Sequence, residues 1–312
     1  MMNQSTVARF ILKGFSDIPA VNAVCTGIFL IIYIWGLLGN ISVIMVIIKD
    51  SHLHTPMYFF LKNLSFLDVC YTSVTMPKAI ANAILGSEDI SLPECVAQLY
   101  LFFALAATEC FLLTAMAYDR CTAIYRPLLY GVSMNKKVCW ELVSTAWICG
   151  ALYSTLHTIT INTFSLPFCG PNVIDHFFCD IPAVMRLSCA DYHANEELSF
   201  IYTSCIIMGA FVLTLISYIC IISTIAKIQH VQGRWKAFST CSSHMTTGIL
   251  FYGTGSSMYL TPTSNYSPIQ GRLAALFYSI ITPTLNPVIY CLRNKEIKGA
   301  LMKVYHQIQR KN

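Results

Sequence analysis

Two acidic residues, Asp68 and Glu109, interrupt stretches of sequence that are otherwise apolar. A charged side chain at the centre of a membrane costs about 2.5–3.5 kcal/mol on insertion scales, so each acid needs a partner or a task. Two carboxyl groups that face one cavity would either share a proton or bind a cation such as sodium. A protonated pair that only fixes helix packing is the alternative. Asn40 and Asn286 could add amide oxygens to either arrangement.

An acidic residue, Asp119, is followed directly by a basic one, Arg120, which lies eleven residues beyond Glu109 in the sequence. Eleven residues of helix make about three turns, or roughly 16 Å, and return the chain to the same face. The preceding residues are apolar, which predicts that the pair lies at a water boundary. A guanidinium there can exchange an internal carboxylate for the backbone carbonyls of a partner, whereas a simple surface ion pair would contribute little.

A third group comprises His176, Cys179 and Asp180, whose residue types are those that bind metal ions. Cys179 is also one of four cysteines, with Cys95, Cys169 and Cys189, that fall in or beside segments expected outside the membrane. An even number of cysteines in an oxidising compartment predicts two disulfides, and four cysteines allow three pairings. A disulfide at Cys179 would remove the thiol that a metal site needs.

The elements that must position these residues follow from the composition. Of the 312 residues, 55% are hydrophobic and only 11% are charged, whereas soluble domains have about 25% charged residues. The apolar residues fall in blocks that are long enough to cross a bilayer as helices, and the short alternating segments of a membrane barrel are not present. The sequence therefore predicts an all-α bundle of seven transmembrane helices, at 24–48, 56–85, 95–125, 139–164, 198–228, 238–260 and 272–292.

The distribution of basic residues predicts the orientation of these spans. With the N-terminus outside, fifteen of the 20 Lys and Arg residues fall on the cytoplasmic side and five on the outside. The net charge of +5 thus reflects topology and gives no reason to expect nucleic-acid binding. One domain, 1–312, would comprise an extracellular tail at 1–23, the bundle at 24–292 and a cytoplasmic amphipathic helix at 293–312. Asn3 begins a glycosylation sequon that an outer tail could use.

Two other classes of protein fit these features less well. A channel or transporter could place Asp68 and Glu109 on an ion path, but the chain lacks the repeated halves from which many transporters are built. A membrane hydrolase would need a nucleophile with its base or a set of metal ligands, and neither an H-E-x-x-H nor a G-x-S-x-G motif occurs. We therefore expect no enzyme activity and no cofactor other than an allosteric sodium ion.

The segment PTLNPVIY at 283–290 places two prolines in one expected span, which predicts a kink. Together with Asn40, Asp68, Asp119-Arg120 and Trp147, it resembles the rhodopsin-like G-protein-coupled receptors. Within them the chain resembles the odorant (olfactory) receptors over nearly its whole length. The motifs that carry this resemblance are LHTPMYFFL at 53–61, MAYDR at 116–120, SY at 217–218, KAFSTCSSH at 236–244 and the long outer loop from 169 to 189.

The resemblance implies a plasma-membrane receptor that binds small, mostly apolar odorants and activates a stimulatory heterotrimeric G protein, which raises cyclic AMP. It implies the disulfides Cys95–Cys179 and Cys169–Cys189, which would hold the loop over the mouth of the bundle. Coupling would involve Asp119, Arg120, Tyr218, Asn286, Pro287 and Tyr290. Ligand contacts would come from Phe102, Leu105, Ala106, Thr108, Tyr202, Thr203, Ile206, Tyr252, Gly255, Ser256, Tyr259, Leu276, Ser279 and Ile280.

Overall fold

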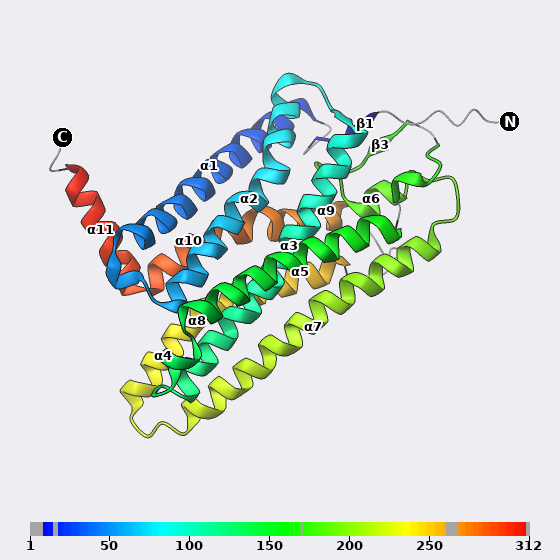
Figure 1. Ribbon diagram of the computed structural model, residues 1–312. Coiled ribbons are helices and arrows are strands. Elements are labelled where there is room, and N and C mark those ends of the chain that lie inside the picture. Colours follow the sequence, from blue (N-terminus) through cyan, green and yellow to red (C-terminus); the bar gives the residue numbers. More distant parts are fainter. Residues whose placement is uncertain (1–8, 15–17, 162, 170, 260–267, 310–312) are drawn as a thin grey trace.

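Long helices that run side by side make up most of the chain (Figure 1). The computed structural model describes residues 9–14, 18–161, 163–169, 171–259 and 268–309. The short strands and helix α6 lie at one end of the bundle, and helices α4 and α11 lie at the other end (Figure 1). The two ends therefore carry different kinds of structure, and the residues discussed above are distributed between them.

The elements follow one another with short connections. The long helices are α1 (Pro19–Lys49), α2 (Pro56–Leu85), α3 (Leu92–Tyr125), α5 (Lys136–Ile161), α7 (His193–Ala226), α8 (Val231–Tyr259), α9 (Pro268–Leu276), α10 (Thr282–Arg293) and α11 (Lys295–Gln309). The short helical elements are η1 (Ser51–Leu53), α4 (Tyr130–Ser133), η2 (Thr163–Ser165), α6 (Ile181–Met185) and η4 (Phe277–Ile281). The strands are β1 (Arg9–Leu12), β2 (Asp89–Ser91) and β3 (Val173–Ile174).

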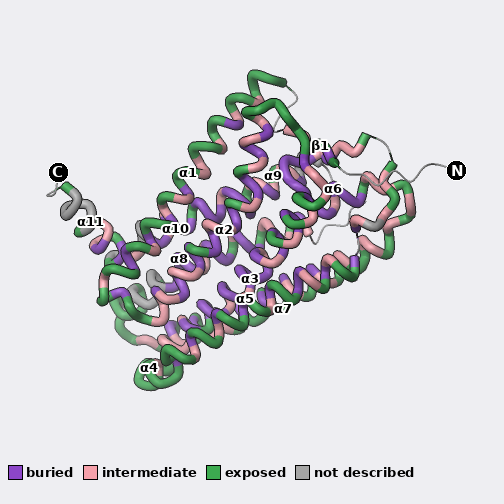
Figure 2. Tube along the Cα trace, turned by 45° about the horizontal axis from the view of Figure 1, so that its top comes forward, coloured by how far each residue is buried: buried purple, intermediate pink, exposed green. Residues whose placement is uncertain are grey.

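Four segments of the described chain are long and apolar enough to cross a membrane: Pro19–Lys49, Leu92–Tyr125, His193–Ala226 and Gly271–Tyr290. Helices α1 and α7 expose large apolar side chains along their outer faces, including Ile31 on α1 and Ile216 on α7 (Figure 2). In water such a continuous apolar surface would be unfavourable, whereas lipid chains accommodate it. The chain is therefore a helical protein with membrane-spanning segments.

Helix α3 lies at the centre of the bundle, where it packs against α2, α5, α7 and α8. Its start is fixed by a capping box, because the Ser91 side chain accepts from the Glu94 N–H while the Glu94 carboxylate accepts from the Ser91 N–H. The approach of α5 is close because residue 150 is glycine, and a Cβ there would overlap Thr108 on α3. Phe102, Glu109 and Asp119 are thus placed along a single fixed helix.

The structure differs from the expected all-α architecture and from the expected tail at 1–23. Strand β1 pairs antiparallel with β2 and parallel with β3, and Phe10 lies opposite Ile90. Phe10 and Leu12, two residues apart, point to the same face of the strand and are buried. Helix α1 also begins at Pro19, five residues before the expected start of the first span. The N-terminal segment is thus partly built into the end of the bundle.

The expected kink near the two prolines takes the form of a π-helical turn, η4, between α9 and α10. Pro283 is the second residue of α10 and has no N–H to continue the hydrogen-bond ladder of the preceding turn. The carbonyl oxygen of Pro283 has no helical donor either, because residue 287 is also proline, and it accepts a bond of 3.1 Å from the amide nitrogen of Asn40 on α1. A polar side chain of the first helix thereby pairs with a carbonyl of α10.

Candidate functional site

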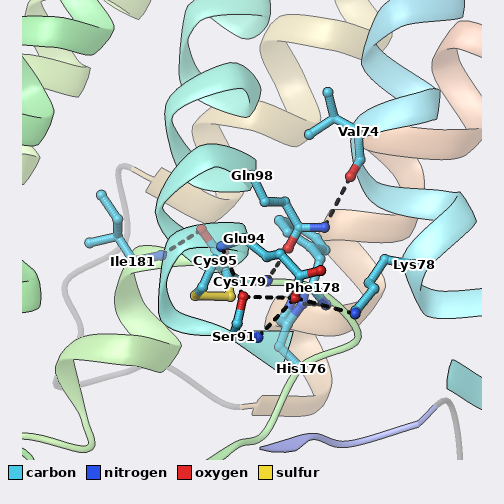
Figure 3. The surroundings of a disulfide bond; sticks show 11 residues. Val74, Lys78, Ser91, Glu94, Cys95, Gln98, His176, Phe178, Cys179 and Ile181 are labelled. Atoms are coloured by element: carbon cyan, nitrogen blue, oxygen red, sulfur yellow. Dashed lines mark hydrogen bonds and ion pairs between the residues drawn. A yellow bond between two sulfur atoms is a disulfide. The ribbon is translucent and has the colours of Figure 1, made fainter. Parts of the chain in front are cut away.

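A disulfide between Cys95 and Cys179 joins the start of α3 to the loop that precedes α7 (Figure 3). The backbone N–H of Cys179 donates to the Gln98 side-chain oxygen at 2.8 Å, and the Gln98 nitrogen donates to the Val74 carbonyl on α2 at 3.0 Å. The loop is therefore attached to two helices by a covalent bond and a relay of hydrogen bonds. A second disulfide, Cys169–Cys189, closes the loop on itself.

Two ionisable residues of this loop, His176 and Asp180, are fully buried. Burial, together with the nearby charge of Arg272, lowers the pKa of His176 to about 3. Burial raises the pKa of Asp180 to about 7, although bonds from the Ile181 N–H at 2.9 Å and the Tyr259 hydroxyl at 3.2 Å oppose that shift. Both shifts favour the neutral forms, as expected for side chains removed from water. The metal site considered for this loop does not form, because Cys179 is in a disulfide and the described residues include no group of three ligands placed to hold an ion.

Below the loop, a cavity of about 50 Å³ lies between α2, α3, α5, α7, α8 and η4. Its wall is apolar and aromatic, and no carboxylate lines it. Several hydroxyl groups at the wall are already paired: Tyr252 donates to the Cys110 carbonyl at 3.1 Å, and Tyr153 bonds to Thr203 at 3.1 Å. The lining residues are Tyr71, Phe102, Phe103, Ala106, Ala107, Cys110, Tyr153, Thr203, Ile206, Ile207, Phe251, Tyr252, Gly255, Tyr259 and Tyr278.

Half of the expected ligand contacts line this cavity: Phe102, Ala106, Thr203, Ile206, Tyr252, Gly255 and Tyr259. The others lie outside its wall: Leu105, Thr108, Tyr202, Ser256, Leu276, Ser279 and Ile280. Thr108, for example, faces Gly150 of α5 and donates to the Ala104 carbonyl. Sequence reasoning missed Tyr71, Phe103, Tyr153 and Tyr278, among others. Their aromatic character was the only available signal, and most aromatic residues in such helices serve packing alone.

Deeper in the bundle lie the two acids found in the sequence. Asp68 and Glu109 are fully buried and interact electrostatically. Asn286 donates to Asp68 Oδ2 at 2.9 Å, and Thr247 donates to the Asn286 oxygen at 3.2 Å. Asp68 Oδ1 and both oxygens of Glu109 accept no hydrogen bond from the described part of the chain. The acids and their polar neighbours thus come from α2, α3, α8 and α10, and three carboxyl oxygens have no hydrogen-bond partner among the described residues.

At the far end of α3, Asp119 is buried and accepts a hydrogen bond of 2.7 Å from the Tyr130 hydroxyl on α4. Arg120 is half-buried, and its charge interacts with the Tyr218, His244 and Tyr290 side chains. The Tyr218 hydroxyl and His244 Nδ1 are hydrogen-bonded to each other. Sequence reasoning missed Tyr130 and its contact with Asp119. Helices α3, α7, α8 and α10 therefore meet around Arg120, with Pro287 one turn above Tyr290 on α10.

Asn3, the expected glycosylation site, lies outside the described residues. Helix α11 follows the bundle where an amphipathic helix was expected. Its Ile297 and Ala300 are buried, whereas Lys303 is exposed and lies 3.9 Å from Asp50 at the end of α1. This helix is thereby docked against the first helix.

Comparison with known proteins shows the family to which the chain is related. Residues 29–308 match the family model described as olfactory receptor. The chain is 44% identical to mouse (Mus musculus) olfactory receptor 5AP2 over 97% of its own length and 95% of that protein. It is 45% identical to human (Homo sapiens) olfactory receptor 10G7, with 97% of each chain covered, and 46% identical to mouse olfactory receptor 8U3, with 97% and 94% covered.

A helical membrane protein of this kind is a G-protein-coupled receptor and not an enzyme. The chain belongs to the olfactory receptor family. Membership of that family implies that the protein senses odorants and has a G protein as a partner.

Proposed function

We propose that this chain is a seven-span odorant receptor of the plasma membrane that binds small, mostly apolar odorants in the cavity beneath the disulfide-anchored loop. Binding activates a stimulatory G protein at the opposite end of the bundle and raises cyclic AMP. The observation that carries the proposal is the apolar, aromatic cavity, whose wall includes residues of α3, the helix that also carries Arg120.

Seven membrane crossings agree with the packing of the helices. In addition to the four most apolar segments, α2, α5 and α8 contain 30, 26 and 29 residues, and each is long enough to cross a bilayer. They carry more polar residues, and Asp68 and Ser154 on α2 and α5 are buried inside the bundle, away from lipid. Both disulfides lie at the end that the charge bias assigns to the outside, where oxidising conditions favour them. The N-terminus would then be extracellular.

The class of ligand follows from the wall of the cavity. The hydroxyl groups of Tyr153, Thr203, Tyr252 and Tyr259 already have hydrogen-bond partners, so a ligand that needs a strong hydrogen bond from them would have to break an existing one. No carboxylate lines the cavity to act as a counter-ion for an amine. The cavity holds about 50 Å³, so larger odorants must displace side chains. These properties favour small, weakly polar molecules.

Coupling would occur where α3, α7, α8 and α10 meet. An agonist that binds one of two conformations more tightly shifts the existing equilibrium toward it. Opening of this end would separate Tyr218 from the Arg120 region and expose Arg120 to a helix of the G protein. Asp119 would then hold Arg120 in the inactive state, and its bond to Tyr130 would fix the position of the carboxylate.

The acids Asp68 and Glu109 would hold one cation between them, either a shared proton or a sodium ion. The three oxygens without a described hydrogen-bond donor fit this role, because hard cations bind carboxylate and amide oxygens. Neutralising the pair would stabilise the packing of α2 against α3. A sodium-dependent shift in agonist potency that Glu109→Gln abolishes would identify the ion as sodium.

The direct test is an odorant panel applied to cells that express this chain with a cyclic-AMP reporter. At least one small apolar odorant should raise cyclic AMP, and Arg120→Ala should abolish that response at matched surface expression. A response that persists in Arg120→Ala would refute the coupling role of Arg120. Odorant-evoked ion flux in liposomes that contain only the purified chain would favour a channel.

A further inference from the structure

An open groove lies far from the odorant cavity, at the end of the bundle that carries α4. It measures about 750 Å³ and runs between the α1–α2 connection on one side and α4 with the start of α5 on the other. The mechanism described above does not use it. Its lining residues are Ile47, Ile48, Leu53, His54, Thr55, Pro56, Phe59, Lys62, Tyr130, Gly131, Met134, Asn135, Lys136, Cys139 and Trp140.

The charges around this groove have one sign. Lys62 and Lys136 line it, together with His54, and no acidic side chain does. Among the described residues, neither lysine forms an ion pair, and the Lys62 ammonium instead lies 5.5 Å from the centre of the Phe59 ring. Two acids lie close by without lining the groove: Asp50 is 3.9 Å from Lys303, and Asp119 accepts a hydrogen bond from the groove residue Tyr130. The lining itself thus presents two lysines that form no ion pair with a described residue.

The N-terminus of helix α2 adds to this positive potential. Helices α2 and α5 begin at Pro56 and Lys136, which both line the groove, but the Asn135 side-chain oxygen already accepts from the Val138 N–H of α5 at 3.0 Å. The Thr55 side chain makes no capping hydrogen bond to α2, so the first backbone N–H groups of that helix have no side-chain acceptor there. Helix N-termini favour anions because their free N–H groups and dipole carry partial positive charge.

Apolar side chains line both sides of the groove beside the lysines. Phe59 and Trp140 pack edge to face with ring centroids 5.0 Å apart, and Ile48 and Leu53 continue the surface from α1 and η1. Trp140 remains 60% exposed, so its ring offers contact area to another molecule. A free anion would use only the lysines, whereas a molecule with both an anionic head and an apolar chain would use the whole groove.

We propose that this groove binds an anionic phospholipid of the cytoplasmic leaflet, with its phosphate between Lys62 and Lys136 and an acyl chain against Phe59 and Trp140. The cytoplasmic leaflet is rich in such lipids, and basic residues near its surface attract them. The lipid would also contact Tyr130, whose hydroxyl binds Asp119. Its binding would therefore restrain α4 beside the coupling region.

The test measures lipid binding to the purified full-length receptor by native mass spectrometry and needs no odorant. Phosphatidylserine should bind at least fivefold more tightly than phosphatidylcholine. Lys62→Gln and Lys136→Gln should each weaken phosphatidylserine binding about fivefold, the effect expected for one basic residue near an anionic surface. Lys137→Gln is the matched control, because Lys137 does not line the groove and lies 3.8 Å from Glu141. It should bind like the unmodified receptor.

Several results would overturn the proposal. Equal binding of both lipids would make the groove a site for neutral lipid. Equally tight binding of glycerophosphoserine or inorganic phosphate would make it a site for a soluble anion. Lysine variants that behave like Lys137→Gln would remove the proposed phosphate contacts. Lys62→Arg and Lys136→Arg keep the charge and should retain binding, so a loss shared by the Arg and Gln variants would indicate a packing role instead.

Discussion

The contact between α3 and α5 gives a sharp test of the packing that positions the odorant cavity. Gly150→Ala would add a Cβ that overlaps the Thr108 hydroxyl and lies 2.6 Å from the Ala104 carbonyl oxygen and 2.9 Å from the Thr108 backbone nitrogen. Two of these atoms belong to the backbone, so a change of rotamer cannot relieve the overlap and the helices must separate. Overpacking of this kind typically costs about 1–3 kcal/mol.

The same substitution also removes the entropic cost of glycine in a helix, which is about 0.5–1 kcal/mol. With two backbone overlaps the cost should lie near the upper end of its range, so we expect a net loss of about 2 kcal/mol. At ~2–4 °C per kcal/mol, the unfolding temperature of the purified receptor should fall by several degrees. Odorant potency should fall as well, because Phe103, Ala106 and Ala107 move with α3.

Gly209→Ala on α7 is the matched control, since a Cβ there meets nothing within 4 Å. It should be neutral or slightly stabilising in the same thermal assay. If Gly150→Ala unfolded at the same temperature as Gly209→Ala, the close approach of α3 and α5 would be refuted.

Two further predictions concern the outer loop. Between about pH 4 and 6.5 the shifted pKa values of Asp180 and His176 have opposite effects on stability. The folded state keeps the Asp180 proton that the unfolded state loses, so this residue lowers stability as pH rises. The folded state excludes the His176 proton that the unfolded state binds, so this residue increases stability as pH rises. Asp180→Asn removes the first effect, so its unfolding temperature should climb more steeply with pH than that of the unmodified receptor, and equal slopes would contradict the burial of Asp180. Cys95→Ser should sharply reduce surface expression, since loss of a native disulfide typically costs about 2–5 kcal/mol. Cys205→Ser changes an exposed free cysteine and should leave surface expression unchanged. Normal surface levels of Cys95→Ser would show that the loop does not need its disulfide.

The helices could be predicted from the sequence because their signal is local. Long apolar blocks and the residues that end them, such as Gly86 with its positive φ of 64° after α2, need no knowledge of distant contacts. Strand β1 escaped prediction for the opposite reason. Its four residues give little alternation, and its partners, β2 and β3, lie far away in the sequence. The separation of Glu109 from Asp119 along α3 was predictable from helical rise alone.

The cavity wall was harder to predict because it depends on how each helix is rotated. Phe102 and Phe103 are adjacent on α3, and both reach the cavity, whereas Leu105 does not. Helix α3 packs closely against Gly150 on another helix, and nothing near Leu105 in the sequence reveals this contact. The bond from Tyr130 to Asp119 likewise depends on the turn taken by the chain after α3.

The central claim is that the odorant occupies the cavity beneath the loop. Its most direct test fills that cavity with Ala106→Phe and compares odorant-evoked cyclic AMP with that of Leu101→Phe, on the same helix but at an exposed position outside the wall. Surface expression is measured in both variants. We predict that Ala106→Phe loses the response to an odorant that activates the unmodified receptor, while Leu101→Phe keeps it. An unchanged response in Ala106→Phe at normal surface expression would contradict the claim.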